Sequence, residues 1–210
     1  MAAGAVEEVR FAAADAVVLE GELAAADAPT MAVVLCHPHP QYGGSMRAGI
    51  IGDLFRALPT GGITTLRFNF RGVERSEGHW DDGRAEQGDV VAAIDTLATA
   101  APALPLALVG WSFGADMALS VRDPRIVGWC AIAPPLHFAT DLDALGADPR
   151  PKHLVLGERD DAVPLDRTLS ATAGWSATTH EVIPGASHFF VGKSDALVDT
   201  AFKFCASVGR

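Results

Sequence analysis

Residues 106–114 read LALVGWSFG and combine three features that decide the fold. The apolar run 106–109 is typical of a strand that is buried on both faces. Gly110 and Gly114 lie two residues to either side of Ser112, and a run of small residues follows. A serine at the tip of so sharp a turn has a strained backbone, and side chains two residues away would collide there. The pattern predicts a strand, a tight turn and a helix.

Ser112, placed at this turn, is a predicted nucleophile. The bare pattern G-x-S-x-G also arises by chance, and the alternative interpretation is an ordinary glycine-flanked turn. Its position directly after a buried strand favours the catalytic interpretation. Because a serine hydroxyl is a weak nucleophile, the rest of the chain must supply a base, an acid and an oxyanion hole.

The composition is that of one globular domain. A chain of 210 residues, 49% of them hydrophobic, is long enough for one substantial core, so we expect a single domain over 1–210. Lys and Arg total 16 against 26 Asp and Glu, which gives a net charge of -10, and the sequence contains no run of basic residues. This balance argues against nucleic acid as a partner.

The N-terminus and the cysteines indicate the compartment. Glu7 and Glu8 stand where a secretory signal would be basic, and no apolar run approaches the roughly 20 residues of a membrane span. We therefore expect neither an export signal nor a membrane partner. Cys36, Cys130 and Cys205 are widely separated in apolar surroundings, which favours buried reduced thiols in a cytoplasmic protein. The alternative of Cys36 as a nucleophile is disfavoured because it lies inside a strand run.

Predicted strands and helices alternate along the chain. Strands are expected at 6–11, 17–23, 31–36, 63–70, 106–109, 126–133, 153–157 and 179–183, and helices at 45–58, 86–99, 165–175 and 192–207, besides the one after Ser112. The first two strands are expected to form an antiparallel hairpin. The alternation predicts an α/β fold, a mostly parallel sheet with helices on both faces. The short segment 134–152 leaves no room for a substantial cap domain.

Chain order selects the base. With this kind of turn the nucleophile, the acid and the histidine follow one another, each in a loop at the carboxyl end of a strand. His188 meets this condition, because it follows the strand 179–183 and precedes the last helix. His180 lies inside that strand and His153 begins another, so both are poorer candidates.

The acid is expected in the loop 158–164, which reads ERDDAVP and follows the strand 153–157. Asp160 lies three residues beyond the end of that strand and precedes a Val-Pro pair that turns the chain into the next helix, so it is favoured. Asp161 is the alternative, and spacing alone leaves both open.

Two backbone N–H groups are needed to hold the developing oxyanion. The first is expected at Phe113, at the amino end of the helix after the turn. The second is expected in the loop 37–44, HPHPQYGG. His39 is the first choice because the prolines beside it have no N–H, and Gln41 and Tyr42 are the alternatives.

The histidines of this loop also raise the possibility of a metal site. His37 and His39 have no carboxylate or cysteine cluster near them, so we predict no metal ligands.

Five motifs then occur in the order of a known superfamily. They stand at 37–44 (HPHPQYGG), 66–78 (LRFNFRGVERSEG), 110–114 (GWSFG), 157–164 (GERDDAVP) and 185–193 (GASHFFVGK). On these motifs nearly the whole chain resembles the α/β-hydrolase superfamily, specifically a group of small, capless bacterial serine hydrolases close to the dienelactone-hydrolase and prolyl-oligopeptidase-like branches. The resemblance implies the α/β-hydrolase fold without a substantial cap. It also implies Ser112 as nucleophile, Asp160 as acid and His188 as base.

The sequence departs from this pattern at two places. Dienelactone hydrolases carry cysteine at the turn, so Ser112 argues against their substrate. The segment Val73, Glu74, Arg75 puts a charge where the family's loop usually has glycine, which leaves the conformation of that loop unpredicted. Catalysis need not depend on it.

The predicted activity is that of a carboxylesterase acting on small or medium acyl esters through an acyl-enzyme intermediate. It requires no metal ion or organic cofactor, and its expected partner is a small-molecule ester. The rival interpretations are an amidase or peptidase, a perhydrolase, or a non-catalytic binding module with the same fold. The expected substrate-binding residues form an apolar and aromatic set: Tyr42, Trp80, Met117, Leu136, Phe138, Phe189 and Phe190.

Overall fold

Eight strands of the described residues form one sheet in this computed structural model, which describes residues 6–209. They are β1 (Val6–Ala12), β2 (Val18–Ala24), β3 (Met31–Cys36), β4 (Ile63–Phe68), β5 (Leu106–Trp111), β6 (Ile126–Ile132), β7 (Lys152–Gly157) and β8 (Thr178–Ile183). Residues 1–5 and 210, which include the start of the segment examined for an export signal, lie outside the described part. A single domain over 1–210 stays a prediction.

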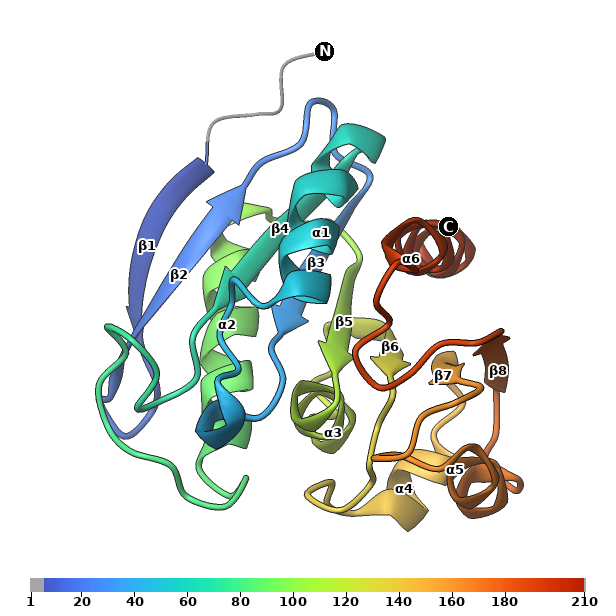
Figure 1. The fold of residues 1–210 in the computed structure, drawn as a ribbon. Coiled ribbons are helices and arrows are strands. Elements are labelled where there is room, and N and C mark those ends of the chain that lie inside the picture. Colours follow the sequence, from blue (N-terminus) through green and yellow to red (C-terminus); the bar gives the residue numbers. More distant parts are fainter. Residues whose placement is uncertain (1–5, 210) are drawn as a thin grey trace.

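The strand order is β1-β2-β4-β3-β5-β6-β7-β8 (Figure 1). β1 and β2 form the expected antiparallel hairpin, and β2 also runs antiparallel to β4. All other neighbouring pairs are parallel. The central strands β3 and β5 are buried at every position, which matches their uninterrupted apolar sequences. The predicted mostly parallel sheet is confirmed.

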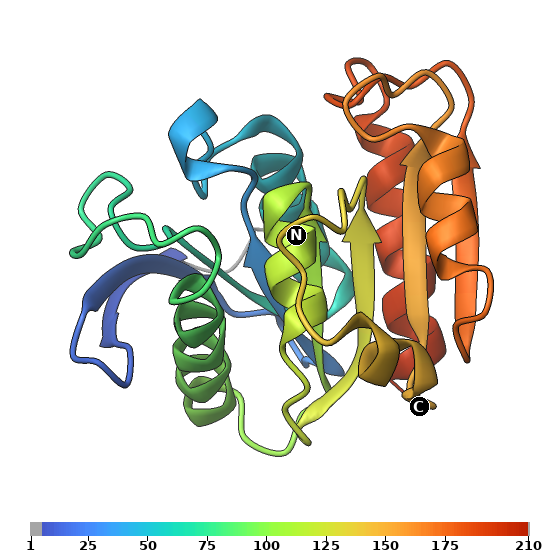
Figure 2. The ribbon, with the colours of Figure 1, turned by 90° about the horizontal axis from the view of Figure 1, so that it is seen from below.

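Helices cover both faces of the sheet (Figures 1 and 2). They are α1 (Gly49–Ala57), α2 (Glu86–Ala100), α3 (Phe113–Ser120), α4 (Leu142–Ala147), α5 (Leu165–Thr172) and α6 (Ser194–Val208), with short 3-10 turns η1 (Pro40–Tyr42) and η2 (Leu58–Gly61). α1 and α6 pack together and bury one apolar cluster against the sheet, whereas α2 and α3 bury a second cluster on the opposite face. Within residues 6–209 no helix has the length and apolar character needed to cross a membrane.

The connection between β6 and β7 contains only α4, a helix of 6 residues. The expected absence of a substantial cap is therefore confirmed. The loops that follow β3, β5, β6, β7 and β8 meet at the carboxyl ends of these strands and form the candidate site.

The predicted helix 45–58 begins later than the sequence pattern indicates, at Gly49. The cause is tertiary: the N–H of Met46 donates to Asn69 Oδ1 at 2.7 Å, and its carbonyl accepts from Arg67 Nη1 at 3.2 Å. Ser45 Oγ accepts the N–H of Arg47 at 3.3 Å, so it closes a turn and does not cap the helix. Side chains distant in sequence hold residues 45–48 outside the helix.

Candidate active site

The turn after β5 has the strained geometry that its glycines predict. Ser112 has φ 55° and ψ -122°, and it directly precedes α3. A Cβ at Gly110 would lie 2.3 Å from the carbonyl oxygen of Gly114, and a Cβ at Gly114 would lie 2.2 Å from that of Cys36. The N–H of Ser112 donates to the carbonyl of Ile132 at 2.8 Å. The two glycines and the neighbouring strand β6 together hold Ser112 in a left-handed conformation.

Three predicted side chains from separate loops meet at this turn. His188, in the loop after β8, has its Nε2 3.0 Å from Ser112 Oγ. Its Nδ1 lies 2.8 Å from Asp160 Oδ2, in the loop after β7. The side chain of Asp160 is 1% exposed and that of His188 is 15% exposed. The structure thus joins Ser112, His188 and Asp160 in one chain of hydrogen bonds.

Asp160 is held on both of its oxygens. Oδ1 accepts the N–H groups of Ala162 at 3.0 Å and Val163 at 2.7 Å, which leaves Oδ2 for His188. Asp161 is exposed and has no hydrogen bond to His188 within residues 6–209. Of the two aspartates that spacing left open, the geometry therefore selects Asp160 as the residue that contacts the imidazole.

This arrangement fixes the chemistry available to the imidazole. A carboxylate at Nδ1 holds a proton there, so the Nε2 lone pair of His188 faces the hydroxyl of Ser112. The Trp111 indole N–H also donates to the carbonyl of His188 at 3.1 Å and holds its loop against the end of β5. The ring can accept the serine proton while the carboxylate stabilises the resulting imidazolium.

The backbone N–H groups of the loop 37–44 differ in whether they have a hydrogen-bond acceptor within the protein. The Gln41 N–H donates to His39 Nδ1 at 3.2 Å, and the Tyr42 N–H donates to the His39 carbonyl at 3.1 Å. The N–H groups of His39 and Phe113 have no acceptor within residues 6–209. Because Gly114 packs directly on the carbonyls of Cys36 and His37, the amino end of α3 lies against this loop. The two amides expected in the oxyanion hole are thus both free to donate to a substrate oxygen.

No model of a known protein family matches the sequence. An uncharacterised protein of Rickettsia prowazekii is 35% identical over 189 residues, which are 84% of this chain and 79% of that protein.

Three solved structures share the whole fold. A protein of unknown function from Agrobacterium tumefaciens, with a proposed α/β-hydrolase assignment, is 32% identical with a TM-score of 0.83, and 95% of each chain is covered. A serine hydrolase homologue from Coxiella burnetii is 29% identical with a TM-score of 0.84, covering 92% of this chain and 96% of that one. A serine hydrolase without a lid from Xanthomonas campestris is 26% identical with a TM-score of 0.79, covering 95% and 94%. This chain belongs to the α/β-hydrolase family.

A cavity of about 410 Å³ opens beside Ser112 in this α/β hydrolase. Of the predicted substrate-binding residues, Tyr42, Phe138 and Phe189 border it. The side chain of Trp111 also borders it, which loop membership could not indicate because Trp111 ends a strand. The wall is mostly apolar and aromatic.

Four predicted pocket residues do not border this cavity. Met117 and Phe190 are buried in the two apolar clusters, Trp80 lies against the His39 ring at 4.6 Å between centroids, and Leu136 packs on the core. The reason is the direction of each side chain: Phe189 is 66% exposed, whereas Phe190, at φ 48°, turns its ring inward to 1% exposure. The position of these two residues in the same loop does not predict that the side chain of Phe189 faces outward and that of Phe190 inward.

Asp116, which sequence reasoning missed, orders the backbone of residues 136–138. It is fully buried on α3, and its carboxylate accepts the N–H groups of Leu136, His137 and Phe138, each at 2.9 Å. Burial raises its pKa to about 6 despite these bonds. The signal in the sequence was a single carboxylate within the apolar run FGADMALS. Asp116 holds Phe138 at the cavity.

The side chain of His37 connects the loop 37–44 to the backbone after β4. Its Nε2 accepts the N–H of Phe70 at 3.0 Å, and its Nδ1 donates to the carbonyl of Pro38 at 2.6 Å. Both ring nitrogens are therefore occupied by backbone groups. Burial lowers the pKa of His37 to about 4.

The buried His37 predicts a pH-dependent stability. Between pH 6.5 and 4 the unfolded chain binds a proton that the folded chain excludes, so stability present above pH 6.5 falls on acidification by about 3 kcal/mol. Urea unfolding at pH 7 and pH 4.5 measures the part of this loss that falls between these two pH values, about 2 kcal/mol. His37→Gln keeps one donor and one acceptor without titrating, so its loss should be smaller by about that amount. An equal loss in both proteins would contradict the assignment.

Proposed function

We propose that this hydrolase is a carboxylesterase that cleaves small or medium, neutral acyl esters. The observation that carries the proposal is the hydrogen-bonded chain Asp160–His188–Ser112 beside an apolar cavity of about 410 Å³. The fold and the family support hydrolase activity on small molecules in general. The ester preference is our inference from the cavity and the serine.

The reaction proceeds by acyl transfer in two steps. Ser112 Oγ attacks the ester carbonyl while its proton moves to His188 Nε2, and Asp160 stabilises the imidazolium. The carbonyl oxygen, now negative, accepts the N–H groups of His39 and Phe113. The alcohol leaves with the proton from His188, and an acyl-Ser112 ester remains. Water, deprotonated by His188, attacks this ester; the bond to Ser112 Oγ breaks, His188 returns the proton to Oγ, and the carboxylic acid is released.

The chemistry of the cavity wall favours neutral substrates. No Asp, Glu, Lys or Arg borders the cavity among the described residues. A carboxylate carried into it would lose hydration without gaining a cationic partner, so an anionic ester should have a kcat/KM about 100-fold below that of its neutral isostere. Comparison of a hemisuccinate ester with the corresponding methyl-capped diester measures this ratio. Equal turnover of the two would contradict a neutral acyl site.

Labelling with a fluorophosphonate and a substrate panel tests the class of activity. We expect covalent labelling of the purified protein and turnover of short-chain and medium-chain p-nitrophenyl esters. The matched p-nitroanilides should react far more slowly because their leaving group is harder to expel. Faster cleavage of anilides would support an amidase, and peracid formation from hydrogen peroxide a perhydrolase. Neither labelling nor turnover would support a binding module.

We further propose that the protein acts in the cytoplasm. Cys36, Cys130 and Cys205 are all free and buried, as suits a reducing compartment. Fractionation of cells that produce the protein tests this, and recovery from a secreted fraction would contradict it.

A further inference from the structure

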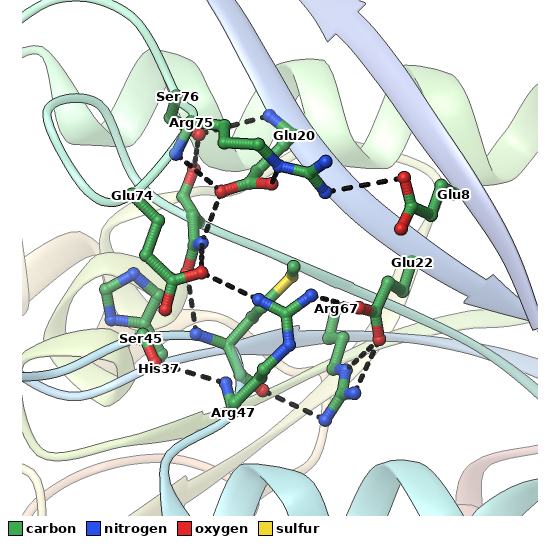
Figure 3. Close-up of polar contacts among 12 residues, drawn as sticks. Glu8, Glu20, Glu22, His37, Ser45, Arg47, Arg67, Glu74, Arg75 and Ser76 are labelled. Carbon is green, nitrogen blue, oxygen red and sulfur yellow. Dashed lines mark hydrogen bonds and ion pairs between the residues drawn. The ribbon is translucent and has the colours of Figure 1, made fainter.

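Figure 3 shows a network of charged side chains that joins β2 and β4 to the segments around Arg47 and Glu74. Four carboxylates and three guanidinium groups meet in it: Glu8, Glu20, Glu22 and Glu74 with Arg47, Arg67 and Arg75. The side chains of Glu20 and Glu22 are only 2% and 10% exposed. Buried charges of this kind cost desolvation, so their arrangement demands a physical explanation.

Arg47 and Glu74 connect two loops that are distant in sequence. Arg47 Nη1 donates to Glu74 Oε2 at 2.6 Å, and its Nη2 binds Glu22. Glu22 in turn accepts from Arg67 Nε at 2.9 Å. Asn69 Nδ2 donates to Glu74 Oε2 at 3.2 Å and to Glu20 Oε1 at 2.8 Å. The strands β2 and β4 thereby hold the segment around Arg47.

Glu74 has a strained backbone within this network. Its φ is 48°, in the left-handed region that favours glycine. The carboxylate is the part of the residue that the network uses, because it binds both Arg47 and Asn69. A glycine would suit the backbone better and would lose both contacts.

The network reaches the candidate active site through the segment 37–49. At one end, His37 accepts the N–H of Phe70. At the other end, the adjacent Asn69 accepts the N–H of Met46 at 2.7 Å. Ala48 and Gly49 border the cavity directly. Both ends of the segment that carries the His39 N–H are therefore attached to residues 69–70.

We propose that the Arg47–Glu74 ion pair, through Asn69, positions the segment 37–49 so that the His39 N–H meets the oxyanion. Arg47 and Glu74 are positioning residues and do not contact substrate. This inference rests on the proposed esterase function. Because a small displacement of an oxyanion donor weakens only the transition state, loss of the pair should lower kcat and leave KM nearly unchanged.

A double-mutant cycle with Arg47→Met and Glu74→Gln tests the proposal. Each single variant should lose about ten-fold in kcat on a neutral p-nitrophenyl ester, with KM within about two-fold of wild type. The double variant should also lose about ten-fold, because the ion pair between Arg47 and Glu74 is already broken in each single variant. Independent losses in kcat that multiply to about a hundred-fold in the double variant would show that Arg47 and Glu74 do not act through their ion pair, which would overturn the proposal.

A second measurement separates positioning from loosened structure. A boronic acid forms a tetrahedral adduct with a nucleophilic serine, and its affinity should fall in each variant by the same factor as kcat/KM. The Ki of a non-covalent ketone of the same size should not change. Equal weakening of both inhibitors would overturn the proposal.

Two further variants serve as controls. Arg125→Met breaks ion pairs with Asp95 at 2.7 Å and Asp123 at 2.6 Å at the amino end of β6, whereas the candidate site lies at the carboxyl ends of the strands, and it should leave kcat unchanged. Glu74→Gly removes the strain and the carboxylate together, so it should keep the Tm and still lose about ten-fold in kcat. An active wild type with unchanged kcat in the Arg47 and Glu74 variants would overturn this inference alone. A wild type that neither hydrolyses esters nor binds the boronic acid would overturn the proposed function itself.

Discussion

Replacing Ser112 by alanine should lower kcat/KM for a short-chain neutral ester by about 10⁴-fold or more. The change removes the oxygen that forms the acyl-enzyme, and it leaves His188 and Asp160 without a nucleophile to activate. The uncommitted N–H groups of His39 and Phe113 remain, so a small residual rate over water is expected. Initial rates with a chromogenic acetate ester measure the loss.

The fold should survive this substitution. The Ser112 hydroxyl has one hydrogen-bond partner among the described residues, His188, and alanine tolerates φ 55° about as well as serine does. The Tm should therefore stay close to that of wild type while fluorophosphonate labelling disappears. Ser187→Ala, which changes an exposed serine beside the same histidine, is the matched control and should keep its activity. Undiminished turnover in Ser112→Ala would overturn the mechanism.

Replacing Asp160 by asparagine should lower kcat by about 10³- to 10⁴-fold. The carboxylate at Nδ1 holds the His188 tautomer whose Nε2 accepts the serine proton, whereas an amide N–H at that point would favour the opposite tautomer. The carbonyl oxygen of asparagine still accepts from Ala162 and Val163, so the loop should keep its shape. The measurement is kcat for the same ester, with Tm as the check on folding.

Asp161→Asn is the matched control for this prediction. It removes the same charge from the next residue, which is exposed and does not contact the imidazole, so kcat should stay within about two-fold of wild type. A larger loss in Asp161→Asn than in Asp160→Asn would show that the acid has been assigned to the wrong residue.

The fold class was predictable because its signals are local. Uninterrupted apolar runs such as 31–36 and 106–109 separate segments of helical periodicity, and the strands β3 and β5 that contain them are fully buried within the sheet. The start of α1 was not predictable, since Asn69 and Arg67 hold the backbone of Met46 outside the helix. Contacts made by residues distant in sequence leave no periodic signal.

The features of the candidate site likewise fall into those that the sequence predicts and those that depend on tertiary contacts. Chain order predicted Ser112, His188 and a choice between two aspartates, and the resemblance implied Asp160. The direction of side chains was beyond the reach of such reasoning: Phe189 borders the cavity, whereas Phe190 fills the core. The burial of Asp116 and His37 could not be predicted either, because a titratable side chain in or beside an apolar run can point into the core or into solvent.

The sequence by itself determined the strand, the glycine-flanked turn and the position of Ser112, because steric exclusion at Gly110 and Gly114 acts over a few residues. Tertiary structure alone decided which N–H groups remain uncommitted in the loop 37–44 and which carboxylate reaches His188. It also decided that Glu74 adopts a left-handed backbone and binds Arg47. The physical reason is that hydrogen bonds and ion pairs depend on distances of a few ångströms, and only the packed chain sets those distances.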